Sequence, residues 1–167
     1  MSKKVIWTIV AVVAVIAVAV GVVLFINTNK KVANVEGTLE ELMAKVYEGI
    51  PAENLPMLGN MPVDSEGVEY YLGTTEVSFK EALASEPMIS SIPHSVVLLR
   101  LNDAKDAEAT VEKIKASVNP RKWICVEASN VIVKSKGDLV ILIMSDTEMT
   151  AEGEALAPKL EANFNNL

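Results

Sequence analysis

An unbroken hydrophobic segment dominates the amino-terminal part of the chain. Between Val5 and Ile26 only Thr8 and Gly21 fall outside the apolar residue types, and no charge or proline interrupts these 22 residues. A helix rises about 1.5 Å per residue, so the segment spans roughly 33 Å and can cross a bilayer core of about 30 Å. A helix also satisfies its own backbone hydrogen bonds within lipid. The sequence therefore predicts a transmembrane helix over residues 5–26, with the lipid bilayer as its partner.

This apolar segment is predicted to be retained as a signal anchor. A cleaved signal peptide has an apolar region of about 7–15 residues followed by small residues, and Phe25 to Lys31 offers no such site. The lysines on the two sides of the segment nearly balance. Residues 1–4 are too few to form a translocated domain, so we expect them in the cytoplasm and residues 27–167 outside the cell membrane.

Beyond a polar linker at 27–37, the apolar positions take on the spacing of a folded domain. The segment Thr38-Leu39-Glu40-Glu41 fits a capping box, which predicts a helix over 38–48. The following segment, 50–67, carries three prolines and two glycines. Such interruptions rule out a continuous helix and predict a loop lying on the domain surface.

The central part of the chain alternates between strand and helix patterns. Residues 68–72 predict a short strand, whereas 79–90 is compatible with either a helix or a strand. The continuous apolar run within 95–101 is typical of a strand covered on both faces. Apolar positions spaced three and four apart predict an amphipathic helix over 104–118.

Two apolar segments near the carboxyl end predict a hairpin. Residues 131–135 and 138–144 flank Lys136-Gly137, where the glycine can adopt a positive φ angle. If these two residues form the loop, Val133 faces Val140. Residues 139–144 are apolar on both sides, which predicts a central strand.

A last segment with apolar residues at helical spacing predicts a helix over 150–164, interrupted by Pro158. The order of the predicted elements favours an α+β fold for one domain at 38–167. We expect a two-layer arrangement in which helices 38–48, 104–118 and 150–164 pack on one face of a mainly antiparallel sheet.

The charge of the chain restricts its partners. Without Lys3 and Lys4 the chain has 13 basic and 22 acidic side chains, a net charge of −9. Nucleic acids and anionic lipid headgroups require clustered lysine and arginine. The domain is therefore not expected to bind nucleic acid.

A search for catalytic and metal-binding motifs finds none. Cys125, the only cysteine, lies in an apolar run and is predicted to be a buried structural thiol. His94, the only histidine, is expected to be a loop residue without a catalytic role. The acidic cluster Asp64–Glu69 lacks the ligand spacing of a calcium loop, and Asp146–Glu148 is typical of a helix N-terminus. Either could hold a weak cation, but solvated turns are the default interpretation. We therefore assign no catalytic, cofactor-binding or metal-binding residue.

Several segments resemble an uncharacterised family of extracytoplasmic domains from Gram-positive bacteria, classed as a domain of unknown function and often tethered as lipoproteins. The segments are Leu39–Met43, Glu86–Ile89, the charged helix and the hairpin from Asn130 to Asp146. The resemblance covers roughly residues 36–160. It implies a membrane-tethered extracytoplasmic location and no known activity, although this chain lacks the cysteine that anchors the lipoprotein members.

Two functions remain open at this point. The first is a single-pass, membrane-anchored extracytoplasmic binding module, non-catalytic, with an unknown protein or small-molecule ligand. The alternative is an extracytoplasmic hydrolase or transferase whose carboxylate-based site leaves no local motif. The absence of phosphate-binding loops and metal clusters from the sequence favours the binding module.

Overall fold

The structure, a computed structural model, describes residues 34–89, 91–146, 149–151 and 153–167. The predicted head, the predicted transmembrane segment and most of the predicted linker lie outside the described residues. Within the described ranges, no helix is both long enough and apolar enough to cross a membrane.

A five-stranded sheet forms the centre of the domain, and all of its neighbouring strands are antiparallel. The α+β class and the mainly antiparallel sheet predicted from the sequence are thus confirmed. Across the sheet the strands are β1 (Leu58–Pro62), β2 (Phe79–Pro87), β3 (Ser95–Leu101), β5 (Leu139–Ser145) and β4 (Asn130–Lys136). A separate two-stranded ribbon consists of β6 (Thr150–Ala151) and β7 (Glu154–Ala155).

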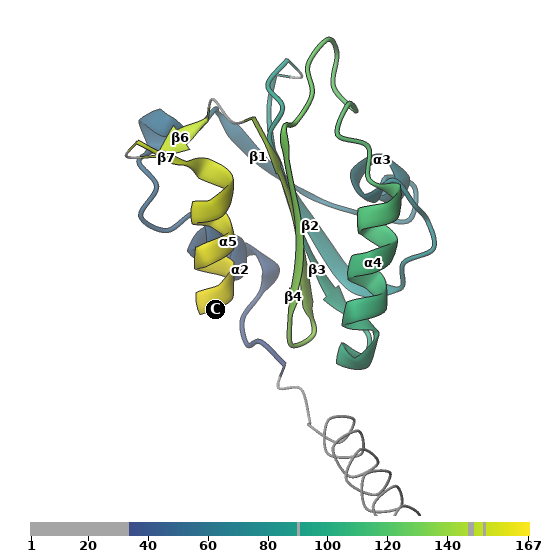
Figure 1. Ribbon diagram of the computed structural model, residues 1–167. Coiled ribbons are helices and arrows are strands. Elements are labelled where there is room, and N and C mark those ends of the chain that lie inside the picture. Colours follow the sequence, from purple (N-terminus) through teal and green to yellow (C-terminus); the bar gives the residue numbers. More distant parts are fainter. Residues whose placement is uncertain (1–33, 90, 147–148, 152) are drawn as a thin grey trace, which may run out of the picture. The chain divides into compact units, whose positions relative to one another are not determined.

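Helices cover both faces of this sheet, so the predicted two-layer arrangement is wrong (Figure 1). The reason lies in β3 and β5, which are buried at every position and therefore need a cover on each side. One face carries α2 (Leu39–Val46) and α5 (Leu156–Asn166), and the other carries α3 (Val68–Leu72) and α4 (Ala107–Ser117). Two short 3-10 helices, η1 (Ala52–Asn54) and η2 (Ala104–Asp106), complete the elements.

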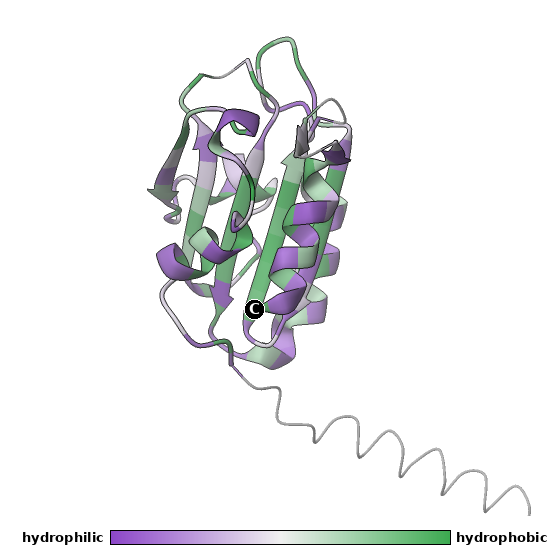
Figure 2. Ribbon diagram, turned by 90° about the vertical axis from the view of Figure 1, so that its left-hand side faces the viewer, coloured by the Kyte–Doolittle hydropathy of each residue, from purple (hydrophilic) through white to green (hydrophobic). Residues whose placement is uncertain are grey.

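Each face of the sheet has its own hydrophobic core. In Figure 2, which looks onto the face covered by α2 and α5, the central strands are coloured as hydrophobic along their length. Alternate residues of one strand divide between the cores, so that Val96 and Leu98 meet α2 and α5 while Val97 and Leu99 meet α3 and α4.

A helix is present in each of the three predicted segments, but the one predicted at 150–164 begins only at Leu156, because residues 150–151 and 154–155 pair as the β6–β7 ribbon. Thr38 caps α2 through a capping box, in which its side chain accepts the Glu41 N–H and the Glu41 carboxylate accepts the Thr38 N–H. The helix predicted at 104–118 is η2 followed by α4. Pro158 lies in the first turn of α5, where its missing N–H would have no intrahelical partner, so it costs the helix little.

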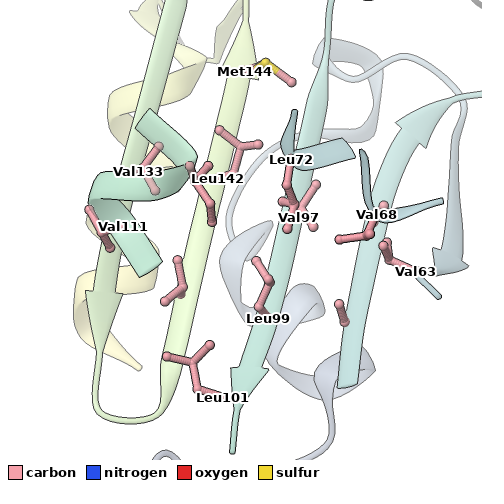
Figure 3. Packing of buried hydrophobic residues seen from close by; sticks show 14 of the residues in the cluster. Val63, Val68, Leu72, Val97, Leu99, Leu101, Val111, Val133, Leu142 and Met144 are labelled. Carbon is pink, nitrogen blue, oxygen red and sulfur yellow. The ribbon is translucent and has the colours of Figure 1, made fainter. Parts of the chain in front are cut away.

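The segment 68–72 is the helix α3 and not the predicted strand. The Asp64 side chain accepts the N–H groups of Glu66 and Gly67, which forms the turn before the helix. Val68 and Leu72, four positions apart, then both point into the core, as Figure 3 shows. Two tyrosines between them gave this segment a strand-like composition, which the local turn overrides.

Two further segments form strands that pair with each other in the sheet. The segment 79–90, compatible with helix or strand, contains β2. The predicted surface loop at 50–67 contains the edge strand β1, in which Pro62 is the last residue. An edge position tolerates proline because an edge strand pairs on one side only.

The predicted hairpin is confirmed, but its register differs by two residues. The turn falls at Gly137-Asp138, and Val133 faces Leu142 where Val140 was expected. A shift of two preserves which side chains share a face. Consequently, Lys134 remains exposed and Val133 remains buried, as the hydrophobic pattern requires.

Candidate functional site

The two ends of the sheet carry different polar clusters. At the linker end, the end of β3, the start of β2 and the β4–β5 turn lie together with Val35 of the predicted linker. At the far end lie Pro87 of β2, Ser95 of β3 and Ser145 of β5. The linker end is the bottom of the sheet in Figure 1, and the far end is the top.

The linker end is organised by the buried Arg100. Its guanidinium donates to Glu81 and Asp138, both at 2.9 Å, and to the backbone carbonyls of Val35 and Gly37 at 2.8 and 2.6 Å. Asp138 also accepts the Val35 N–H at 2.9 Å. Residues 35–37 are therefore held against the sheet by a charge-assisted network.

The far end is organised by Lys122, which lies in the segment between α4 and β4. Its ammonium group is buried and makes an ion pair with the buried Glu86 carboxylate, and it lies 3.2 Å from the Ser95 hydroxyl. The rings of Tyr70, Tyr71 and Trp123 surround it, with centroids at 4.5, 4.9 and 5.2 Å. Aromatic faces stabilise a cation at such distances.

This arrangement bears on the chemistry available to Ser95. A serine nucleophile with a lysine base requires a neutral amine and access for the substrate. Burial lowers the pKa of Lys122, but the Glu86 carboxylate opposes that shift and pairs with the charged form. Ser95 itself has no exposed surface. The contacts of Lys122 therefore attach the 118–129 segment to the sheet and do not form a nucleophile–base pair.

On the opposite face of the far end, Tyr47 contacts His94. The Tyr47 hydroxyl lies 2.7 Å from Nε2 of His94, whose Nδ1 is buried and has no hydrogen-bond partner among the described residues. Burial lowers the pKa of His94 to about 4, so the imidazole is neutral at physiological pH. His94 is a loop residue directly before β3, as predicted, and it is fully buried.

The far end also exposes several apolar side chains. Met57 is 76% exposed, Met88 72% and Ile124 70%, and Ile89 is exposed beside Met88. Met57 and Met88 lie on the paired ends of β1 and β2, since the Met88 N–H donates to the Met57 carbonyl at 3.0 Å. Met57, Met88 and Ile89 thus lie together, and neighbouring exposed apolar side chains are typical of interaction surfaces.

A depression of about 400 Å³ lies beside β1 on the α2 side of the sheet. Apolar side chains and a few polar groups form its walls, as is usual in binding grooves. The lining residues are Glu40, Met43, Ala44, Tyr47, Leu55, Leu58, Asn60 and Ser85. This depression was not predictable from local sequence patterns, because its walls come from three separate segments.

The other residues weighed in the sequence search lie apart from this depression. Cys125, predicted to be buried, is exposed and adopts φ = 61° in the segment between α4 and β4. Asp64 caps the turn before α3, and Asp146 accepts from the Ser129 hydroxyl at 3.2 Å. Residues 147–148 lie outside the described residues. Across the described ranges, no group of three or more histidine, cysteine or acidic side chains could hold a metal ion.

Sequence reasoning missed the residues that define the far end. Lys122 and Glu86 are 36 positions apart, and Tyr70 was assigned to a strand. The adjacent tyrosines at 70 and 71 and the isolated Lys122-Trp123 pair were the only local signals. Comparison with protein-family models, curated proteins and solved structures finds no match to this chain.

Proposed function

We propose that this protein is a single-pass membrane protein whose extracytoplasmic domain binds another molecule and catalyses no reaction. Residues 5–26 serve as the anchor, and the domain presents its far end to the partner. The exposed apolar group at that end, Met57, Met88, Ile89 and Ile124, carries the proposal. Four large apolar side chains at one end of an otherwise acidic domain cost solubility, and an interaction surface accounts for them.

The position of the linker supports the same function. Arg100 and Asp138 hold Val35 and Gly37 at the end of the sheet opposite to Met88. A domain that is tethered through a segment at one end has its other end accessible to a partner. The predicted membrane location and the resemblance to tethered extracytoplasmic domains fit this role.

The enzyme alternative has less support from the far end. Among its buried ionisable side chains, Glu86 and Lys122 are paired with each other and His94 is bound to Tyr47, while Ser95 is inaccessible. The depression beside β1 contains one carboxylate, that of Glu40, whereas acid–base hydrolysis with carboxylates uses a pair.

Photo-crosslinking in the native cells tests the binding function. The full chain carrying a photoreactive amino acid at Met88 should give a discrete crosslinked species in its native membrane. The same amino acid at Lys105, an exposed position in η2, which follows β3 at the linker end, serves as the control. A crosslinking pattern that is the same at both positions, or absent at Met88, would contradict the proposal.

The single, exposed Cys125 provides a test of topology. A membrane-impermeant maleimide should label the full chain in intact cells and should leave a Cys125→Ser variant unlabelled. Labelling that requires cell lysis would place the domain inside and overturn this part of the proposal.

A further inference from the structure

The edge strand β1 differs from the other edge of the sheet. None of its five residues, Leu58–Pro62, is charged, and Met57 before them is also uncharged. The opposite edge strand, β4, carries Lys134 and Lys136. Charged side chains on edge strands prevent unwanted pairing, so β4 has a protection that β1 lacks.

The backbone of β1 offers hydrogen-bonding groups on its outer side. Met57 accepts the Met88 N–H and Val63 donates to the Ala82 carbonyl, so residues of this parity point their backbone groups toward β2. In an antiparallel ladder the intervening residues point theirs outward. Leu58 and Asn60 therefore direct their N–H and C=O groups away from the sheet.

Both faces beside β1 provide contacts for an added strand. On the α2 side lies the depression of about 400 Å³ that includes Leu58 and Asn60. On the α3 side lie the exposed Met61 and Tyr70, and the Tyr71 hydroxyl approaches the Met61 sulfur at 4.0 Å. Methionine side chains adapt to varied partners, which suits a surface that receives side chains of a bound peptide.

The chain around β1 is strongly acidic. Residues 46–79 contain six acidic side chains and no lysine or arginine. Glu53, Asp64, Glu66 and Glu69 are exposed within a few residues of β1 or of α3. The nearest buried cation, Lys122, is already paired with Glu86. This charge distribution favours a basic partner and disfavours an acidic one.

We propose that β1 binds an extended, basic segment of a partner protein, which adds to the sheet as a sixth strand. The inference rests on the proposed binding function and specifies its partner. Backbone hydrogen bonds to Leu58 and Asn60 hold the segment, as in other cases of strand addition. Its apolar side chains contact the depression on one face and Met61 on the other, while its lysine or arginine side chains meet the acidic residues around β1.

Binding of model peptides to the full chain in detergent micelles tests this mode. The probes are a short capped peptide of alternating lysine and valine, and a matched peptide of alternating glutamate and valine. The basic peptide should bind at least about tenfold more tightly, and added salt should weaken it. On binding, amide exchange at Leu58 and Asn60 should slow. Equal affinities, or exchange at these two amides that does not change, would overturn the proposal.

A substitution at Asn60 separates the backbone from the side chain. Asn60→Pro removes an outward N–H and no bond to β2, so the fold should be retained while the affinity for the basic peptide falls about three- to tenfold. Asn60→Ala removes the side chain and keeps the N–H, so it should bind with nearly unchanged affinity. Equal affinities in a folded Asn60→Pro variant and in Asn60→Ala would contradict strand addition.

Charge reversal tests the choice of partner. Glu53→Lys combined with Glu66→Lys should weaken the basic peptide by about tenfold or more, whereas the same changes at Glu108 and Glu112 on α4 should have little effect. Equal losses of affinity in the two double variants would mean that the peptide responds only to the net charge of the domain, and this would overturn a site at β1.

The outcomes also distinguish this inference from the proposed function. A crosslink at Met88 that survives Asn60→Pro would leave a binding module with another mode of contact, and the strand-addition proposal would fail alone. If the basic peptide binds at β1 but no crosslink forms in cells, the edge is competent for strand addition and the cellular binding function fails.

Discussion

The two ends of the sheet hold a buried cation in different ways. At the linker end, two carboxylates and two backbone carbonyls accept hydrogen bonds from Arg100. At the far end, Lys122 has one carboxylate, one hydroxyl and three aromatic rings. The planar guanidinium can bind several acceptors at once, whereas the ammonium acts as a point charge that aromatic faces can surround. The first arrangement joins distant segments rigidly, and the second leaves apolar surface around it for contact with a partner.

Removal of the cation at the linker end should have the largest effect. Arg100→Leu leaves the Asp138 carboxylate buried without its partner, which should destabilise the domain by about 3–5 kcal/mol. Amide exchange at Val35 should also accelerate, because Arg100 no longer binds the Val35 carbonyl or holds Asp138, the acceptor of the Val35 N–H, in place. Urea unfolding and hydrogen exchange measure the two effects. A loss below about 1 kcal/mol would show that the network contributes little.

The corresponding change at the far end should cost somewhat less. Lys122→Met keeps much of the contact with the aromatic rings but leaves Glu86 unpaired, which should cost about 3 kcal/mol. The double variant Lys122→Met, Glu86→Gln should recover part of this loss, since the buried charge is removed. A double variant less stable than the single one would contradict an ion pair as the source of the effect.

The fold class was predictable from sequence because the apolar patterns of β3, β5 and α4 are strong and local. The number of layers was not, although the apolar run at 95–101 already required two covered faces. α3 and β1 were missed for related reasons. Each is five residues long, so its conformation depends on a turn at Asp64 or on pairing with β2 more than on its own composition.

The candidate site was less accessible to sequence reasoning than the fold. Lys122, Glu86 and Tyr70 come from three separate elements, and their proximity arises only once the sheet and α3 are formed. Cys125 misled for a different reason, because its apolar neighbours suggested burial. In the structure Trp123 is buried, whereas Ile124 and Cys125 point outward. The predicted anchor at 5–26 and the family resemblance stay predictions.

Acid should destabilise the domain through His94 at the far end. The folded-state pKa of His94 is lowered by burial to about 4, below the unfolded value of about 6.5, so the unfolded chain binds more protons between these values. This contribution to stability is complete above pH of about 6.5 and is lost as the pH falls toward 4. Between about pH 7.5 and pH 5 the loss should be about 2 kcal/mol.

Unfolding free energies of the wild type and of His94→Gln over this pH range measure that loss. Glutamine does not titrate, so the variant should show a flatter dependence. Parallel curves for the two proteins would exclude His94 as the group responsible.

One glycine at each end of the sheet differs in backbone conformation. Gly37 at the linker end adopts φ = 111°, and an added Cβ would lie 3.2 Å from the Glu41 carboxylate. Gly37→Ala should therefore cost about 1–2 kcal/mol. Gly59 of β1 shows no such strain, and its Cβ would make an ordinary contact with Met88 at 3.8 Å, so Gly59→Ala should be neutral or slightly stabilising. Thermal unfolding measures both, and equal effects would contradict the assigned strain.

The smallest effect on stability is expected for the exposed apolar side chains of the far end. Met88→Lys and Ile124→Lys should each change the free energy of unfolding by no more than about 0.5 kcal/mol, because both side chains are largely in water. The same variants should weaken binding of the basic peptide, since lysine adds a charge that repels it. Among the described residues, no large apolar side chain is exposed at the linker end, so that end has no equivalent positions. A decrease of more than about 1 kcal/mol in the free energy of unfolding, measured with urea, would mean that Met88 or Ile124 packs within the domain. These side chains would then not form a free interaction surface at the far end.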